Sequence, residues 1–307
     1  MQTEWVWLWV PVTILAAALQ TGRNAVQRGL TDQLGTLGAT QVRFVFGLPF
    51  ACLFFMLAWW AGDFVWPGAN WSFIRFVLLG ALAQIAATAL MLAAMQMRDF
   101  VVVTVWTKTE PVQIALFGLL VLGDVLSWNG MFAISLATLG VVWMAWRPIG
   151  RNSPEGSSSS SLRPVLLGLA AAAGFAVAAV GFRGAILALP EGNFVVRASW
   201  TLVCGLTIQT IILAAWLSWR APETWQRCLG AWRVSLWGGF LGAAASQAWF
   251  VGFALTTAAN VRTLALIEVF FAQIVSRKLF QGQTTAREKL GMTLIVCGVA
   301  WLLWLGA

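Results

Sequence analysis

Long apolar runs alternate with short polar connections along the whole chain. A run of about 20 apolar residues is what a helix needs to cross the hydrocarbon core of a bilayer. The pattern predicts helices at 5–29, 38–61, 73–97, 100–122, 128–147, 164–189, 194–217, 234–256, 259–280 and 286–305. We therefore expect an all-α polytopic membrane protein with ten transmembrane helices.

The second half of the pattern repeats the first. Residues 80–146 align with residues 238–304 without a gap, and the alignment places Glu110 opposite Glu268. Five helices in each half is an odd number, so the two halves would enter the membrane in opposite directions. The sequence thus predicts two inverted five-helix repeats.

A stretch rich in proline, serine and charged residues, RPIGRNSPEGSSSSSLRP, separates the two halves. Such a composition is typical of a flexible linker. We expect a first repeat at 1–147, a linker at 148–163 and a second repeat at 164–307. One chain then carries both halves, so a monomer is sufficient for function, and a dimer is possible.

The composition agrees with a membrane protein. The chain is 60% apolar and 10% charged, whereas soluble domains are about 25% charged. The net charge of +8 comes mostly from Lys and Arg in alternate connections. These basic residues therefore indicate how the helices are oriented in the membrane. They do not predict a nucleic-acid partner. They place the linker in the cytoplasm and both termini outside, in an inner or plasma membrane.

Two carboxylates interrupt apolar helices, Glu110 within VVVTVWTKTEPVQIALF and Glu268 within TLALIEVFF. An ionisable residue inside a membrane is costly, so a functional site is the default hypothesis. Lys108 lies beside Glu110, and Pro111 removes a backbone N–H, which predicts a helix kink. The alternative is a simple kink in which Glu110 pairs with Lys108 or an arginine.

Arg262 precedes Glu268 by six residues, so the two side chains lie on different faces of one helix. Each needs a partner from elsewhere, and Arg43 and Arg197 in other helices are the obvious candidates. A structural salt bridge and a substrate anchor both remain open. The embedded cations, with Lys108, outnumber the carboxylates, which would suit a solute bearing carboxylate or phosphate.

Aromatic and amide side chains accompany the carboxylates. Trp106 and Gln113 are about one helical turn from Glu110, on its face. Trp249 is one of few tryptophans well inside a predicted helix, since most flank helix ends. An aromatic wall beside a carboxylate would form a substrate pocket, and plain packing is the alternative.

The chain shows no enzyme signature. It has no histidine, which excludes His-based zinc sites, and it has no phosphate-binding loop, nucleophile elbow or dinucleotide fingerprint. Its four cysteines have no paired spacing. We expect no catalytic residues, no cofactor and no bound metal.

The segments TKTEPVQIALFGLLVLGDVLS and LATLGVV, with the second-half copy LIVCGVAWLL, resemble the drug/metabolite transporter superfamily of the EamA type. Arg43 matches an arginine that such proteins often carry in the second helix. The resemblance implies secondary transport, often export of amino acids or other metabolites, through a central cavity. This chain departs from the family pattern at two positions. Asp124 replaces a frequent glutamate, and Pro111 of the first half aligns with Val269 of the second half, which is not a proline.

The expected function is export of a small polar or amphipathic metabolite by alternating access, with Glu110 and Glu268 exchanging protons with the substrate. Two alternatives remain. One is a uniporter or exchanger of an anionic solute, bound by the arginines and Lys108. The other is a membrane sensor or assembly subunit whose polar residues lock helices together.

Overall fold

The structure is a computed structural model that describes residues 7–95, 106–145, 163–271 and 286–305. Every regular element among these residues is helical, as the apolar runs predict. The elements are α1 (Trp9–Val45), α2 (Leu48–Ala61), α3 (Trp71–Met95), α5 (Glu110–Leu122), α6 (Trp128–Ala145), α7 (Arg163–Ala188), α8 (Phe194–Arg220), α9 (Pro222–Gly230), α10 (Trp232–Leu255), α11 (Ala258–Leu264), the 3₁₀ turn η1 (Ala265–Ile267) and α13 (Ala286–Leu305).

Five helical segments are long and apolar enough to cross a membrane: Gly38–Ala61, Trp71–Met91, Leu166–Ala188, Phe194–Arg220 and Trp232–Leu255. Two shorter apolar helices accompany them, at Glu110–Leu122 and Trp128–Met144. The all-helical membrane class is therefore confirmed. Predicted helices 100–122 and 259–280 lie partly outside the described residues, as does the linker, and the count of ten remains a prediction.

The first two predicted helices differ from the structure. They are expected at 5–29 and 38–61, but α1 continues through the intervening polar stretch to Val45. The chain turns within α1 at Gly35, whose φ of 70° favours glycine. A second interruption at Gly47 separates α1 from α2. The apolar pattern marks the second span correctly but carries no signal for where its helix breaks.

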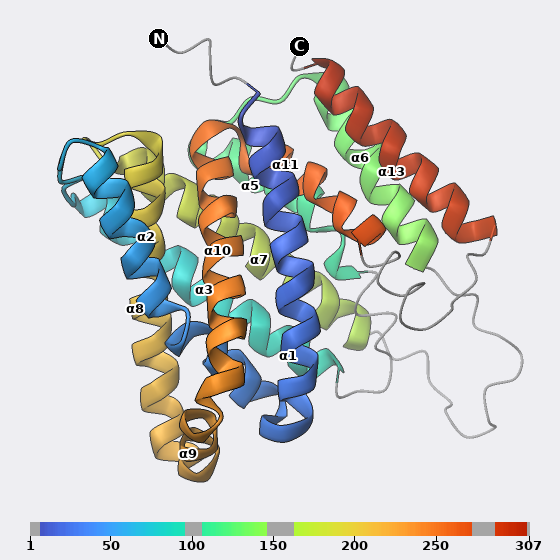
Figure 1. Cartoon of the computed structure of the whole chain (residues 1–307). Coiled ribbons are helices and arrows are strands. Elements are labelled where there is room, and N and C mark those ends of the chain that lie inside the picture. Colours follow the sequence, from blue (N-terminus) through green and yellow to red (C-terminus); the bar gives the residue numbers. More distant parts are fainter. Residues whose placement is uncertain (1–6, 96–105, 146–162, 272–285, 306–307) are drawn as a thin grey trace, which may run out of the picture.

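The short helix α9 was not predicted, because PETWQRCLG was interpreted as a connection. Pro222 occupies its first turn, where the missing N–H is tolerated. Figure 1 shows α9 at the end of the bundle opposite the start of α1 and the end of α13. The exposed Arg220 lies beside it.

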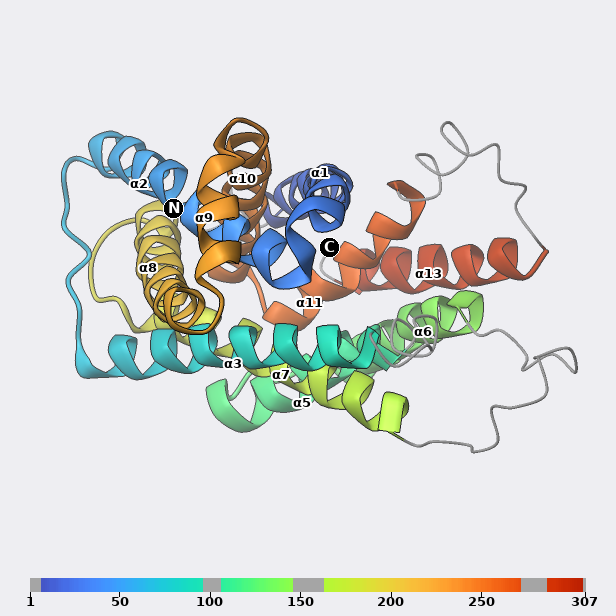
Figure 2. The same ribbon diagram turned by 90° about the horizontal axis from the view of Figure 1, so that it is seen from below.

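Three helix pairs form the body of the bundle: α3 with α7, α1 with α10, and α6 with α13. Figure 2 shows α3 and α7 side by side along their length. Small residues allow the close approach, since a methyl group on Gly181 would lie 2.8 Å from the backbone nitrogen of Gly80. On α10, a methyl on Gly239 would lie 2.4 Å from the Phe46 carbonyl oxygen. The break after α1 therefore packs directly on α10.

Candidate functional site

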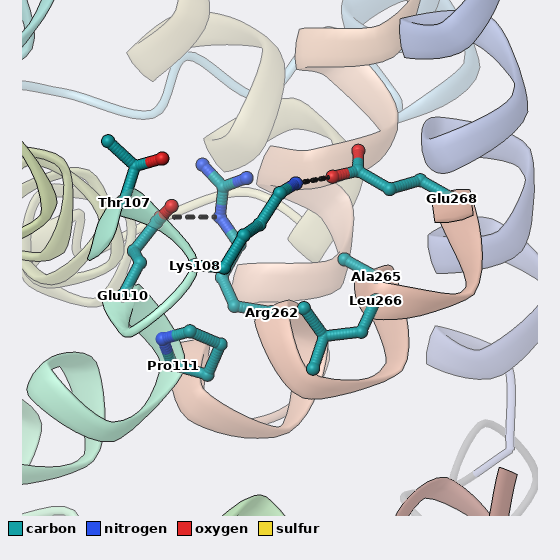
Figure 3. Close-up of a pocket in the computed structure, with 8 residues that line it drawn as sticks. All are labelled: Thr107, Lys108, Glu110, Pro111, Arg262, Ala265, Leu266 and Glu268. Carbon is teal, nitrogen blue, oxygen red and sulfur yellow. Dashed lines mark hydrogen bonds and ion pairs between the residues drawn. The ribbon is translucent and has the colours of Figure 1, made fainter. Parts of the chain in front are cut away.

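Two carboxylates inside the bundle each meet a cation from a distant part of the chain. Lys108 donates a hydrogen bond to Oε1 of Glu268. The Arg262 Nε lies 3.3 Å from Oε1 of Glu110, at ion-pair distance without hydrogen-bond geometry. Figure 3 shows the two pairs facing each other across a pocket. We call Lys108, Glu110, Arg262 and Glu268 the charge quartet.

A break in the fourth predicted helix positions the first two members of the quartet. Lys108 lies in a turn, and α5 begins at Glu110 with Pro111 in its first turn. Proline is tolerated there because no helical N–H is required. Because of this turn, the side chains of Lys108 and Glu110 point in different directions. They reach different partners and do not pair with each other.

The ninth predicted helix is also irregular where it contributes. Arg262 lies in the last turn of α11, and η1 separates it from Glu268. The tighter 3₁₀ turn changes the direction of the side chains that follow it. The quartet is thus built at two helix interruptions that face each other, which brings four charges to one place inside the bundle.

Two further side chains tie Glu268 to neighbouring helices. Gln20 of α1 donates to Oε2 of Glu268 at 2.9 Å, and Trp249 of α10 donates its indole N–H to Oε1 of Gln20 at 3.1 Å. The guanidinium carbon of Arg262 lies 4.9 Å from the ring centre of Trp249, which is cation–π geometry. Gln20 was not predicted, although an amide within the apolar run ILAAALQTG is a usable signal.

The pocket in Figure 3 has an empty volume of about 290 Å³, including space that opens to its surroundings. Side chains of the quartet keep exposed fractions of 29% for Lys108, 18% for Glu268, 20% for Arg262 and 18% for Glu110. The pocket is lined by the quartet together with Thr107, Pro111, Ala265 and Leu266. The four charged side chains are therefore partly open to the pocket.

The remaining sequence candidates lie outside this lining. Gln113 donates to the Thr109 hydroxyl at 3.0 Å, and that hydroxyl donates to the carbonyl oxygen of Trp106 at 2.7 Å. These contacts close the turn before α5. Arg197 lies in the first turn of α8.

Arg43 lies in the last turn of α1. Arg43 and Arg197 were the expected partners for the charges of the ninth helix, but Lys108 and Glu110 take that place. The reason is that the two helix interruptions face each other directly. Interhelical geometry of this kind leaves no mark in a single sequence.

A second buried ion pair lies at the end of α5. The Nε and Nη2 of Arg183 each donate to Asp124 at 3.1 Å. Its Nη1 donates to the carbonyl oxygen of Phe253 at 2.5 Å and to that of Thr256. Gly123, with a φ of 69°, turns the chain after α5 so that Asp124 reaches this position. We call Arg183 and Asp124, with the two carbonyls, the arginine clamp.

Among the described residues, no three His, Cys, Asp or Glu side chains gather as metal ligands. The chemistry available at the quartet is that of charge pairing and of proton exchange on its two carboxylates.

Comparison with known proteins matches the chain to a family and to solved structures. Residues 7–146 match the model of the EamA-like transporter family. A solved structure titled "Crystal structure of protein" superposes with a TM-score of 0.67, covering 97% of this chain and 97% of the other, at 15% sequence identity. At this identity the likeness shows the fold alone. None of the curated proteins matches the chain.

Proposed function

We propose that this chain, which belongs to the EamA-like transporter family of the drug/metabolite transporter superfamily, exports a small polar or amphipathic metabolite by alternating access. Membership makes it a membrane transporter; the direction, the solute and the mechanism are our proposal. One observation carries it, namely a pocket inside the bundle where two helix interruptions bring together four charged and partly accessible side chains.

The arrangement of helices supports two inverted repeats at 1–147 and 164–307. If α1 corresponds to α7, and α3 to α10, then the contacts α3–α7 and α1–α10 are equivalent under exchange of the repeats. The quartet takes one Lys–Glu segment from the first repeat and one Arg–Glu segment from the second. A rocking motion between the halves would act on both ion pairs at once.

In this mechanism the two halves can move apart only when the charges of the two ion pairs are compensated in another way. Separating a buried pair leaves uncompensated charges, which costs several kcal/mol. A substrate whose charged groups replace one partner lowers that cost. A proton on Glu110 or Glu268 removes the carboxylate's share of it and leaves the cation free to bind an anionic group of the substrate. In our proposal the quartet therefore stays closed when empty and opens when substrate or proton binds.

The distribution of charge supports an orientation with the α9 end in the cytoplasm. Arg220, Arg227 and Arg233 surround α9, which lies opposite the start of α1 and the end of α13. Basic residues favour the cytoplasmic side. In this proposal the protein resides in the inner or plasma membrane with both termini outside.

Efflux from proteoliposomes tests the function. Vesicles containing wild type or Glu110→Gln are loaded with a metabolite mixture, a pH gradient is imposed, and the released compounds are identified by mass spectrometry. Wild type should release a few related compounds, and Glu110→Gln should retain them. The matched control is Glu223→Gln, the same chemical change at an exposed position of α9.

Each other outcome removes a defined part of the proposal. Normal pH-dependent efflux through folded Glu110→Gln would exclude proton exchange at this carboxylate. Absence of selective movement in wild type, under both gradient directions, would favour the sensor or assembly alternative.

A further inference from the structure

We infer that Arg23 and Arg43 form an oxyanion-binding subsite beside the charge quartet, and that the transported solute carries a carboxylate or phosphate group. This inference rests on the proposed transport function, because it names the chemical class of the solute. It begins from two guanidinium groups that form no ion pair among the described residues.

Arg23 of α1 is buried within the described part of the bundle. Only 9% of the residue is exposed. Its Nε and Nη2 donate to Oδ1 of the neighbouring Asn24, at 3.2 Å and 2.7 Å. That partner is a neutral amide, and no carboxylate of the described residues lies within ion-pair distance of Arg23. A guanidinium has five N–H donors, and two of those of Arg23 are used in contacts among the described residues.

Arg43 is less well satisfied. Its Nε is buried and has no hydrogen-bond partner, and no ion pair to it is found among the described residues. Its guanidinium carbon lies 5.2 Å from the ring centre of Phe44. The like charges of Arg23 and Arg262 act on it. Without an anion, Arg43 sits in a repulsive field.

The two arginines converge on α10 at a residue without a side chain. The chain reversal at Gly35 brings both ends of α1 against this helix. A methyl group on Gly242 would lie 3.3 Å from Cγ of Arg43 and 3.5 Å from Cδ of Arg23. The aliphatic stems of the two side chains therefore pack on one surface of α10, and in our inference one anion bridges the two guanidinium groups.

Gln20 lies between the arginines and the charge quartet. Arg23 follows Gln20 by about one helical turn, on the same face of α1. Gln20 holds Glu268, and the field of Glu268 acts on Arg23. A solute in the pocket could thus contact the quartet with one group and the arginines with another.

Charge balance favours an anion over simple packing. Lys108 and Arg262 already engage Glu268 and Glu110, so the quartet is neutral. Arg23 and Arg43 add two positive charges that those carboxylates do not pair. Long basic side chains usually reach toward water when unpaired, but Arg23 is too buried to do so. The planar fork of arginine matches the oxygens of carboxylate and phosphate.

Thermal unfolding of the purified full-length protein in neutral detergent tests the subsite. The probes are sodium phosphate and sodium acetate, with choline chloride at equal ionic strength as the blank. A ligand that binds only the folded state raises the unfolding midpoint. We expect phosphate or acetate to raise it by a few degrees in wild type and in the exposed control Arg220→Gln, but not in Arg43→Gln or Arg23→Gln.

Two further variants keep the test decisive if the glutamine variants do not fold. Gly242→Ala crowds both guanidinium stems and should reduce the anion-dependent shift while the protein remains folded. Arg43→Lys keeps the positive charge but loses the planar guanidinium with its paired N–H donors. It should give an intermediate shift of the unfolding midpoint. Equal shifts in wild type and Gly242→Ala, or no shift in wild type, would overturn the inference.

A lipid headgroup offers the same chemistry as a phosphate solute, so its contribution is measured separately. If phosphatidylglycerol in the micelles raises the midpoint of wild type and free phosphate and acetate do not, the occupant is a lipid and the solute class is wrong. Stabilisation by the free anions supports the inference.

Transport separates the inference from the proposed function. Efflux of carboxylates or phosphates that falls at least about tenfold in Arg43→Gln supports both. Efflux of neutral or cationic solutes that is unchanged in Arg43→Gln leaves the transporter in place and overturns the anion subsite. Binding of phosphate without any efflux from wild type supports the subsite and overturns transport.

Discussion

The arginine clamp and the charge quartet are both buried ion-pair sites, yet they are built differently. In the clamp, Nε, Nη1 and Nη2 of Arg183 all donate, and the two side chains are only 11% and 14% exposed. In the quartet, each pair has one contact and the side chains are 18–29% exposed. A site in which each guanidinium nitrogen donates a hydrogen bond holds helix ends in place. A site whose charged groups keep unused donors and acceptors can exchange one partner for another.

The largest effect should follow from breaking the clamp. Arg183→Leu leaves Asp124 and the carbonyls of Phe253 and Thr256 without their donor, and removing one partner of a buried pair costs about 3–5 kcal/mol. Denaturant unfolding in detergent should show this loss. Arg220→Leu, an exposed arginine of α8, is the control. Unchanged stability of Arg183→Leu would show that the clamp does not hold the fold.

A double variant of the quartet should have a large effect on transport and a small one on stability. Lys108→Gln with Glu268→Gln removes both charges of one pair and leaves no buried charge without its partner, so we expect about 1 kcal/mol of destabilisation. Efflux should fall at least about tenfold, because the pair responds to substrate in our proposal. A folded double variant with wild-type efflux would make the quartet a helix lock and favour the sensor alternative.

The sequence indicated the quartet because charges inside apolar helices are costly wherever they occur. Glu110, Lys108 and Arg262 stand out against their apolar neighbours, and the six-residue spacing correctly separates Arg262 from Glu268. The pairing itself could not be predicted from spacing. It depends on two helix interruptions meeting in space, and only the one at Pro111 carries a residue signal.

The clamp and the helix ends were harder to predict for the same reason. Asp124 was noted only as a departure from a family pattern, since a carboxylate after a helix is ordinary in a loop. Its role appears when α7 and the end of α10 converge on it. The positions of the spans follow from apolar runs, whereas the break at Gly47 depends on the close approach of α10, which is a tertiary effect.

An intermediate effect is expected at Gln20, which links the quartet to α10. Gln20→Leu removes the 2.9 Å hydrogen bond to Glu268 and leaves the indole N–H of Trp249 unpaired. Loss of these bonds should cost about 1–3 kcal/mol. Glu268 also loses the contact that holds it to α1, so efflux should fall. Wild-type efflux with reduced stability would make Gln20 a packing residue only.

The smallest effect should come from Trp249→Phe, because most of the ring is retained. The variant loses the 3.1 Å bond to Gln20 and keeps an aromatic face under Arg262. We expect about 1 kcal/mol of destabilisation and a modest loss of efflux. Combining it with Gln20→Leu in a double-mutant cycle measures their coupling. If the indole acts through Gln20, the two losses will not add. Additive losses would mean that Trp249 supports the pocket through Arg262 alone, and the quartet would then be held from α10 by a cation–π contact instead of a hydrogen-bond chain.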